Sequence, residues 1–417
     1  MKGMVSVFVT DQHQQLREAI RAFALAKVAP RVAEMESSAA VDTALPDLIA
    51  QRGWIGVTIP RQYGGMGAGH LAKTILIEEL SRVSGAAGAI AQASQLGVAK
   101  ILHFGTEQQK QQWLAPIAAG KCLPTIATTE EDSGGHVLGM RATARRGGDH
   151  YILNGRKQYV GNSHVGHVHG VIARTGDADT RPSKSLSAFL VRADLPGVRL
   201  VPHQPAMGLC GFSFGDIVFE DVRVPVGDRL GEEGDGLDVA YSSSVLYGRP
   251  NLTAVSLGIH QAIVDATVEF VSTRRRYDAP LANLPSIKHK LGLMQHRLLT
   301  ARVAAYHAVH LLDHGQPCDR ELMSAKYGNV EAAMDSARTA MEIHAAAGLR
   351  TDHEAQRYYR DTACIYAPAG TGDIQLLRLA ETALGISRGP QWSVRFAHLT
   401  ALHPPSAPTE TTRKPAA

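Results

Sequence analysis

The chain has 417 residues, of which 44% are hydrophobic and 20% charged; this composition is typical of a globular protein with two or three packed domains. The formal net charge is +4 and no basic run is longer than Arg274–Arg276, so nucleic acid is not expected as the main partner. The four cysteines stand far apart, which argues against disulfides or a zinc site and favours a reducing cytoplasm.

The N-terminal part, about 120 residues, carries apolar side chains at helical spacing. Leu16 and Ile20 mark a first helix, which we expect Asp11 to cap and Pro30 to interrupt. The segments HLAKTILIEELSRV and TEQQKQQWLAPIAAG predict two further helices, and Thr106 is the expected cap of the second.

Short alternating runs broken by Asn-Gly, Pro-Gly and Gly-Asp begin near Thr125 and predict a β domain. Helical periodicity returns after the linker GEEGDG, and the Pro- and Thr-rich end predicts a disordered tail. We therefore expect an α+β multidomain protein with N-terminal helices over 1–123, a β-barrel or sandwich over 124–235, a helical bundle over 236–397 and a tail over 398–417. No segment has the apolar length of a membrane span or the pattern of a signal peptide, so we expect a cytoplasmic protein.

A histidine-rich segment, NSHVGHVHG, raises the question of a metal site. On a strand, His167 and His169 would share one face and His164 would lie on the other. No Cys or carboxylate nearby completes a ligand set, so we expect no metal. The segments SLGIHQ and GDGLD lack the glycine spacing of a dinucleotide-binding turn.

Several motifs occur in the order and at the spacing of one known family. They are GWIGVTIPRQYGGMG followed by EEL, then NGRKQYVGNS, FEDVRVP, YGRPNLTAVSLG, RRRYDAPL and RDTACIYAPAGTGDIQ. Together with the order of helices, β domain and helices, they resemble the acyl-CoA dehydrogenase superfamily from about residue 10 to residue 395. The resemblance implies that family's fold, with a helical domain, a β domain and a C-terminal helical bundle.

The resemblance also implies FAD as the cofactor, held between the β domain and the C-terminal helices of two subunits in a homodimer or homotetramer. Arg274 matches an element that contacts the FAD pyrophosphate of a neighbouring subunit, and a guanidinium suits a diphosphate. Thr371 stands ahead of a predicted helix, whose free N–H groups attract anions. The implied cofactor positions are Thr129, Tyr159, Gly161, Arg274, Tyr277, Gly348, Thr371 and Asp373.

The catalytic positions depart from the family pattern. Most members place a glutamate, the base that removes the substrate's Cα proton, where this chain has Ala369; a minority place it at Gly248, immediately before Arg249. Neither side chain can accept a proton. The resemblance implies that the backbone N–H at position 369 binds a thioester carbonyl, and Ala369 keeps that N–H.

Further departures surround the implied flavin and substrate. The family's hydroxyl donor to flavin N5 is replaced by Gly161, two residues after Tyr159. The implied substrate positions are Arg249, Leu246 and Gly135, of which Leu246 replaces an Asp and Gly135 a Ser. Other usual residues are replaced by His136, Glu342, Ala345 and Ala346.

Our leading hypothesis is a flavin-dependent oxygenase or oxidase of secondary metabolism that acts on a small organic or thioester-bound substrate. Family relatives that lack the glutamate use reduced flavin with oxygen. We expect Ala369 and Gly161 to remove side-chain volume from both sides of the space beside flavin N5. A flavin reductase or an acyl carrier protein is then a possible partner.

Two alternatives remain open. The first is an acyl-CoA or acyl-carrier-protein dehydrogenase with a relocated base, for which the candidates are Tyr247, Glu131, Asp132 and His136. The second is a non-redox binding scaffold that has kept the fold, which the replaced residues at Ala345 and Ala346 favour.

Overall fold

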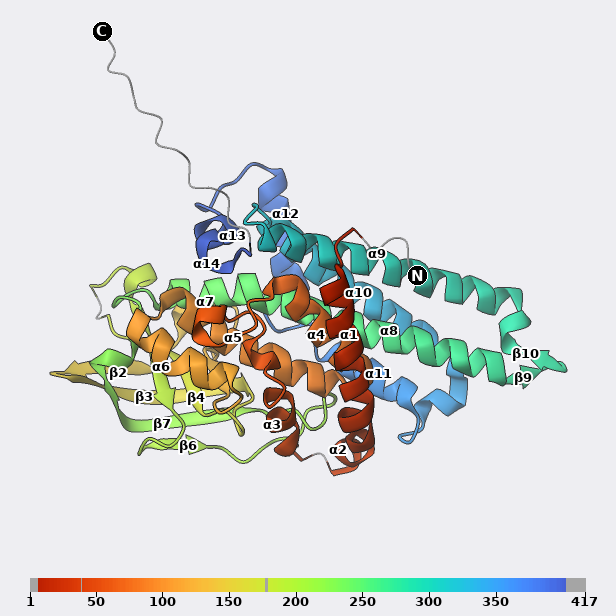
Figure 1. Ribbon diagram of the computed structural model, residues 1–417, viewed down its shortest axis with the longest axis horizontal. Coiled ribbons are helices and arrows are strands. Elements are labelled where there is room, and N and C mark those ends of the chain that lie inside the picture. Colours follow the sequence, from red (N-terminus) through yellow and green to blue (C-terminus); the bar gives the residue numbers. More distant parts are fainter. Residues whose placement is uncertain (1–6, 39, 177–178, 403–417) are drawn as a thin grey trace, which may run out of the picture.

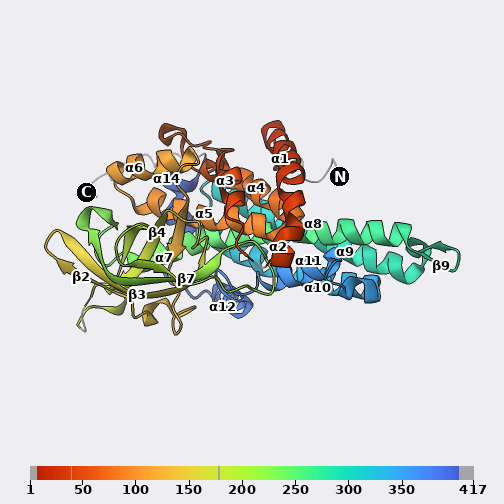
Figure 2. The same cartoon turned by 90° about the horizontal axis from the view of Figure 1, so that it is seen from below.

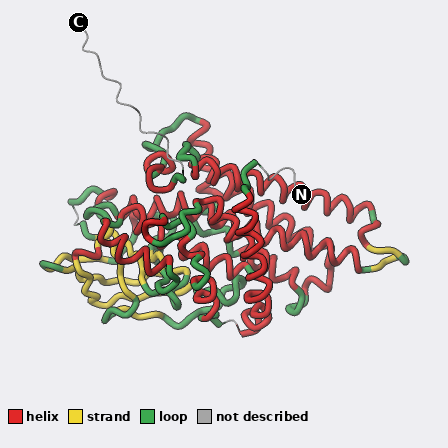
Figure 3. The backbone as a smooth tube through the Cα atoms, viewed as in Figure 1, coloured by secondary structure: helices red, strands yellow, loops and turns green. Residues whose placement is uncertain are grey.

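The computed structural model describes residues 7–38, 40–176 and 179–402. The main sheet lies at one end of the molecule, helices fill the middle, and long helices reach the opposite end, where a small hairpin lies (Figure 3). The predicted order of helices, strands and helices is confirmed.

The N-terminal helices begin at capping residues. The Thr10 hydroxyl accepts from the His13 N–H at 3.4 Å, and His13 Nδ1 accepts from the Thr10 N–H at 3.2 Å. This capping box makes Thr10 the cap and corrects our assignment of Asp11, which is the first helical residue. The predicted Thr106 cap is confirmed by a second capping box. The helices are α1 (Asp11–Phe23), α2 (Val32–Ser38), α3 (Ala44–Ala50), α4 (Gly69–Val83), α5 (Gly85–Phe104) and α6 (Glu107–Ala118).

Helix α4 is buried on nearly all sides, and a polar cluster crosses it. Glu78 Oε1 accepts from Arg302 Nη2 at 2.9 Å, and Glu78 Oε2 accepts from the Tyr306 hydroxyl. Arg302 Nη2 also donates to Gln261 Oε1 at 2.9 Å, and Arg17 lies beside the same carboxylate. This cluster, Arg17–Glu78–Gln261–Arg302–Tyr306, joins three helices of the core to α1.

The β domain is one eight-stranded sheet in the order β6-β7-β3-β2-β4-β5-β8, with β1 parallel to β4. The long strands β3 and β7 are antiparallel, with register shifts between Leu153 and Gly155 and between Lys157 and Val160. Such bulges bend a strand and re-aim its side chains. The strands are β1 (Pro124–Ala127), β2 (Thr143–Gly147), β3 (His150–Gly161), β4 (Val168–Arg174), β5 (Leu186–Arg192), β6 (Val198–Leu200), β7 (Phe214–Pro225) and β8 (Arg229–Leu230).

The C-terminal helices pack against α4 and α5 and carry the chain away from the sheet (Figures 1 and 2). A π-helical turn, Ser244–Gly248, connects α7 to α8, and the hairpin β9–β10 connects α8 to α9 at the far end of the molecule (Figure 1). The elements are α7 (Gly236–Ser243), α8 (Arg249–Thr273), β9 (Arg275–Arg276), β10 (Ala279–Pro280), α9 (Pro285–Asp313), α10 (Asp319–His344), α11 (Glu354–Ala363), α12 (Gly372–Ala383), α13 (Trp392–Arg395) and α14 (Ala397–Thr400).

Two sequence-based expectations need correction. Residues 398–402, which we assigned to a tail, form most of α14 and then dock, because the Leu402 N–H donates to the Asp313 carbonyl at 2.8 Å. Residues 403–417 lie outside the described part. The continuous helix Gly236–Thr273 is long and apolar enough to span a membrane, contrary to our reading, although 72% of its apolar window is buried inside the protein, as in a core helix.

Candidate functional site

The two positions that lack a carboxylate face each other across one contact. Ala369 lies in the loop between α11 and α12, and Gly248 ends the π-helical turn before α8. A Cβ added to Gly248 would lie 3.0 Å from the Ala369 Cβ and 3.6 Å from Leu96 Cδ2. The sequence-predicted positions 248 and 369 therefore belong to one site, which holds only a methyl group between them.

A pair of buried polar side chains fixes the loop that carries Ala369. Lys326 Nζ donates to the Tyr366 carbonyl at 2.7 Å and to the Gly370 carbonyl at 2.8 Å. Gln375 Nε2 donates to the Ala369 carbonyl at 3.0 Å. Ala369 has φ 56, a left-handed conformation that a non-glycine residue keeps only when its surroundings impose it. The Ala369 N–H has no hydrogen-bond partner among the described residues and is free to bind a carbonyl oxygen.

Replacing Lys326 with methionine is expected to loosen this loop. Methionine keeps the aliphatic stem but leaves the Tyr366 carbonyl unpaired, at a cost of about 1–3 kcal/mol, while the Gly370 carbonyl keeps only its weaker bond from Gln375 Nε2 at 3.2 Å. Hydrogen exchange of residues 364–371 should become at least about tenfold faster. The matched control is Lys290→Met, which removes a surface pair with Glu342 and should leave this exchange unchanged. Unchanged exchange in Lys326→Met would show that the clamp does not hold the loop.

An exposed aromatic side chain marks the implied flavin side of the site. Tyr159 lies in the β3 bulge with φ 55, and its side chain is 57% exposed although large and apolar. Its ring stacks on Phe214 with centroids 5.6 Å apart, and Phe214 stacks on Phe212 at 6.1 Å. An aromatic face left open beside the bulge suits a planar ring system.

The space beside Gly161 is not open as we expected. A Cβ added there would lie 3.0 Å from both the Ala93 Cβ and Phe212 Cζ. The missing side chain is therefore replaced by close approach of Phe212, which corrects our expectation that both sides of the site gain volume.

A buried carboxylate on α11 positions the segment that contains Phe212. Asp361 Oδ1 accepts from the Leu209 N–H at 2.6 Å, and the Leu209 carbonyl accepts from the Phe212 N–H at 3.0 Å. Burial raises the pKa of Asp361 to about 6, against the lowering influence of Arg357. The charge state of Asp361 thus changes within the working pH range.

The free energy of unfolding should depend on pH because of the raised pKa of Asp361. Its folded-state pKa of about 6 exceeds the ordinary 3.8, so its contribution to stability is fully present below about pH 4 and is lost as the pH rises through 6. In Asp361→Asn this dependence disappears. The difference in unfolding free energy between wild type and variant should shift by up to about 3 kcal/mol between pH 4 and pH 7, with the wild type relatively weaker at pH 7. Urea unfolding at both pH values measures it, and a difference that is independent of pH would contradict the assignment.

The remaining implied cofactor residues lie at two separate places. Thr371 is the N-terminal cap residue of α12, makes no capping bond with its side chain and is exposed with Asp373, so the helix start can receive an anion. Arg274 and Tyr277 lie at the β9–β10 hairpin, at the opposite end of the molecule from the sheet (Figure 1), and Tyr277 is 88% exposed. A single cofactor that contacts Tyr159 of one chain and also an Arg274 would therefore need the β9–β10 hairpin of a second chain.

The described residues fit FAD. The stacked face at Tyr159 suits the flavin ring, the start of α12 offers free N–H groups, and the hairpin offers an exposed guanidinium for a phosphate. The buried Thr128 hydroxyl and Gln158 Oε1 also lack partners among the described residues, beside Thr129 and Tyr159. Gly348 is buried in a 3-10 turn after α10, preceded by Ala345 at φ 50.

The candidate bases occupy two environments, an exposed loop and a buried aromatic cluster. Glu131, Gly135 and His136 are exposed in the loop after β1, and Asp132 pairs with Arg141 at 3.2 Å. Leu246 is fully buried in an apolar cluster. The Tyr247 ring packs on His70 and His103, with centroids 4.9 and 5.7 Å away, on α4 and α5.

Arg249 is the predicted substrate residue that remains next to the site. It is the first residue of α8, adjacent to Gly248, and its buried Nε has no hydrogen-bond partner among the described residues. Burial lowers its pKa to about 10, although Asp319 opposes this. A buried guanidinium without a bonded partner can bind an acceptor of the substrate.

Lys326, Gln375 and Phe212 are site residues that sequence reasoning did not identify. A lysine on the apolar face of a predicted helix, in MSAKYGNV, and the aromatic alternation in GFSFGD were the available signals. Across the described ranges, no group of three or more His, Cys, Asp or Glu side chains is arranged to hold a metal.

Comparison with known proteins identifies relatives over nearly the whole chain. Descriptions of the acyl-CoA dehydrogenase N-terminal, middle and C-terminal domains match residues 10–121, 125–222 and 234–384. The chain is 34% identical over 376 residues to the mitochondrial short-chain specific acyl-CoA dehydrogenase of Mus musculus, covering 90% of each chain. It is 33% identical over 379 residues to the 3-(aryl)acrylate reductase of Clostridium sporogenes, covering 91% of this chain and all of that one. The solved structure of the prolyl acyl carrier protein oxidase AnaB matches with a TM-score of 0.84 at 25% identity, covering 90% of this chain and 99% of that one.

Proposed function

Because this chain belongs to the acyl-CoA dehydrogenase family of FAD-dependent oxidoreductases, we propose that it oxidises a small organic or thioester-bound substrate with oxygen as the electron acceptor. The observation that carries the proposal is the contact between Gly248 and Ala369. Both positions at which the family is expected to carry its base lack a carboxylate, so no side-chain atom beyond a Cβ stands where a proton acceptor is expected.

At the Gly248–Ala369 contact, the residues of this chain bind and orient the substrate and do not transfer its protons. The free N–H of Ala369 donates to the substrate carbonyl, while Lys326 and Gln375 hold the loop in place. Tyr159, Thr371 and the hairpin Arg274 of a second subunit hold FAD, which when bound supplies the ring that exchanges electrons with substrate and oxygen. A substrate with an acidic C–H or an amine nitrogen would depend less on a protein base for its oxidation.

The proposal includes a homodimer or homotetramer in the cytoplasm, because the cofactor residues of one chain lie at opposite ends of it (Figure 1). An acyl carrier protein or a flavin reductase is the proposed partner. The relationship to a carrier-protein oxidase supports the first of these.

A second candidate is an acyl thioester dehydrogenase, or its reverse as a reductase. The retained N–H of Ala369 favours it, as do the relatives that act on short-chain acyl-CoA and on aryl acrylates. In that case the base or acid comes from another residue or from solvent.

An oxygen electrode separates the two candidates. The FAD-loaded protein is mixed with saturated short-chain, aryl-substituted and prolyl thioesters, and product is quantified with and without oxygen. The proposal expects turnover only with oxygen, with hydrogen peroxide released or oxygen-18 incorporated into the product. Sustained anaerobic turnover with ferrocenium as acceptor would establish the dehydrogenase instead.

A further inference from the structure

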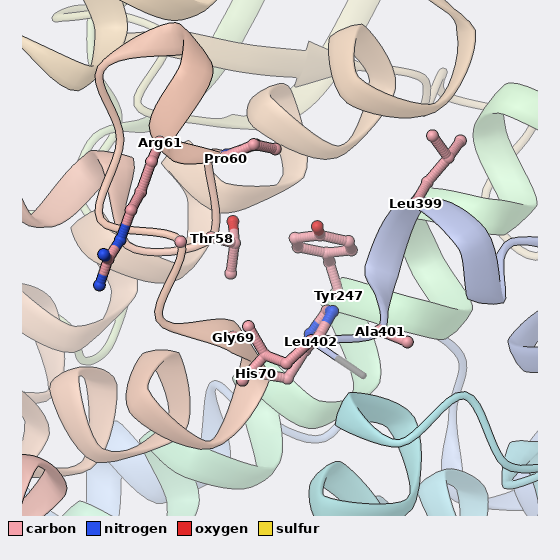
Figure 4. A pocket seen from close by; sticks show the side chains of 10 residues that line it. Thr58, Pro60, Arg61, Gly69, His70, Tyr247, Leu399, Ala401 and Leu402 are labelled. Atoms are coloured by element: carbon pink, nitrogen blue, oxygen red, sulfur yellow. The ribbon is translucent and has the colours of Figure 1, made fainter. Parts of the chain in front are cut away.

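A cavity lies beside the π-helical turn Ser244–Gly248, which contributes Tyr247 to its lining. Its volume is about 250 Å³, and its walls come from the loop 58–70, from Tyr247 and from the C-terminal residues Leu399, Ala401 and Leu402 (Figure 4). It can therefore hold a small organic molecule but not a CoA thioester.

A fully buried phenol faces this cavity without a hydrogen bond. The Tyr247 hydroxyl lies beside the Thr58 hydroxyl (Figure 4), and Thr58 donates its proton to Gln95 Oε1 at 2.9 Å. The Tyr247 hydroxyl has no partner of good geometry among the described residues. Burial raises the pKa of Tyr247 above its ordinary value, so the group keeps its proton and needs an acceptor.

A second donor lies beside Tyr247. Lys73, which is fully buried, lies with Nζ 2.8 Å from His70 Nδ1 and 4.1 Å from the centre of the Tyr247 ring. With Lys73 Nζ as the donor in this contact, the ring proton of His70 lies on Nε2. No described residue accepts from that nitrogen. Asp313, the nearby carboxylate, is occupied by the N–H groups of His70 and Leu71 at 2.6 and 2.8 Å.

The lining thus combines donors with an apolar wall. Tyr247 O–H and His70 Nε2–H seek acceptors, and no carboxylate lines the cavity. Leu399, Leu402 and Pro60 form the apolar wall. A ligand that satisfies this lining carries an anionic acceptor at one end and a small apolar body at the other.

We propose that this cavity is a binding site for a small organic carboxylate, whose oxygens accept from Tyr247 and His70. Neither Ala369 nor Gly248 lines this cavity. The cavity is nevertheless linked to the Ala369 contact, because Tyr247 and Gly248 are consecutive residues of one π-helical turn. Such turns are frequent at functional sites, so occupancy on one side is positioned to affect the other.

Calorimetry with phenylacetate as the probe tests the site on the FAD-loaded protein. Phenylacetate should bind, and the neutral 2-phenylethanol should bind at least about tenfold more weakly because it lacks the anionic acceptor. Tyr247→Phe removes only the hydroxyl and should weaken phenylacetate binding by about 10- to 100-fold, the range for a hydrogen bond to a charged group. The control is Tyr63→Phe, in the same loop region, where the hydroxyl donates to Glu107 at 2.8 Å; it should leave binding unchanged.

Competition with butyryl-CoA distinguishes this cavity from the substrate site. Excess butyryl-CoA should not displace phenylacetate. The proposal is overturned if phenylacetate does not bind, if Tyr247→Phe binds it as tightly as the wild type, or if butyryl-CoA displaces it competitively. Since binding is measured without turnover, its failure leaves the proposed oxidation untouched.

Discussion

Replacing Ala369 with glutamate is expected to supply a general base for the dehydrogenation of an acyl-CoA. The new side chain extends from a Cβ that already stands at φ 56, so the loop held by Lys326 and Gln375 needs no new backbone conformation. A positioned general base contributes about 10²–10⁴-fold to proton abstraction. The rate at which butyryl-CoA reduces the bound FAD without oxygen should therefore rise by about that factor, followed as bleaching of the flavin absorbance.

Two companion variants make this result interpretable. Ala369→Gln has nearly the same shape but no base, and it should remain as slow as the wild type. Gly248→Glu should gain much less, because its Cβ would lie 3.0 Å from the Ala369 Cβ and one of the two segments must shift. If the glutamine variant reduced FAD as fast as the glutamate variant, the missing base would not explain the difference from the family.

Replacing Glu78 with alanine is expected to cost about 3–5 kcal/mol of stability, the penalty for removing one partner of a buried ion pair. Arg302 and Tyr306 would stay buried but lose Glu78 as their hydrogen-bond acceptor. Gln261 would then be the remaining acceptor for the Arg302 guanidinium. Although burial alone would raise it, Arg302 and Arg17 hold the pKa of Glu78 below its ordinary value, so the charged form is the one that binds α1 and α9 to α4. Urea unfolding at constant FAD concentration measures the loss.

Glu220→Ala is the matched control, because Glu220 pairs with Arg199 on the surface at 3.2 Å and both side chains are more than half exposed. Its cost should stay within about 1 kcal/mol. Glu78→Gln keeps an acceptor but loses the charge and should fall between the two. Equal losses for Glu78→Ala and Glu220→Ala would mean that the buried cluster does not hold the helices together.

The layout of the fold was readable from the sequence because the local signals are strong. Helical spacing around Leu16 and the turn pairs after Thr125 predict the correct element types, and the motif order predicts the family. Asp11 was wrongly assigned as the cap, because the capping box formed by Thr10 has a histidine, His13, at the position where Glu or Gln is usual.

The candidate site was only partly readable, because its geometry depends on contacts between distant segments. The motif positions identify Ala369 and Gly248 as candidate site residues, but they do not predict that a Cβ added at Gly248 would lie 3.0 Å from the Ala369 Cβ. Lys326, on α10, reaches a loop 40 residues away, and no sequence spacing encodes that contact. The space beside Gly161 could not be predicted either, because it is filled by Phe212. Phe212 lies in the segment after β6 that Asp361 binds through the Leu209 N–H.

The central claim is that the volume freed at Ala369 lets reduced FAD react with oxygen. Its most direct test is stopped-flow reoxidation of the photoreduced enzyme in air-saturated buffer, compared between the wild type and Ala369→Glu. The wild type should be reoxidised rapidly, and the glutamate variant more slowly because its side chain fills that space. A wild-type enzyme that stays reduced in air as long as Ala369→Glu does would contradict the account.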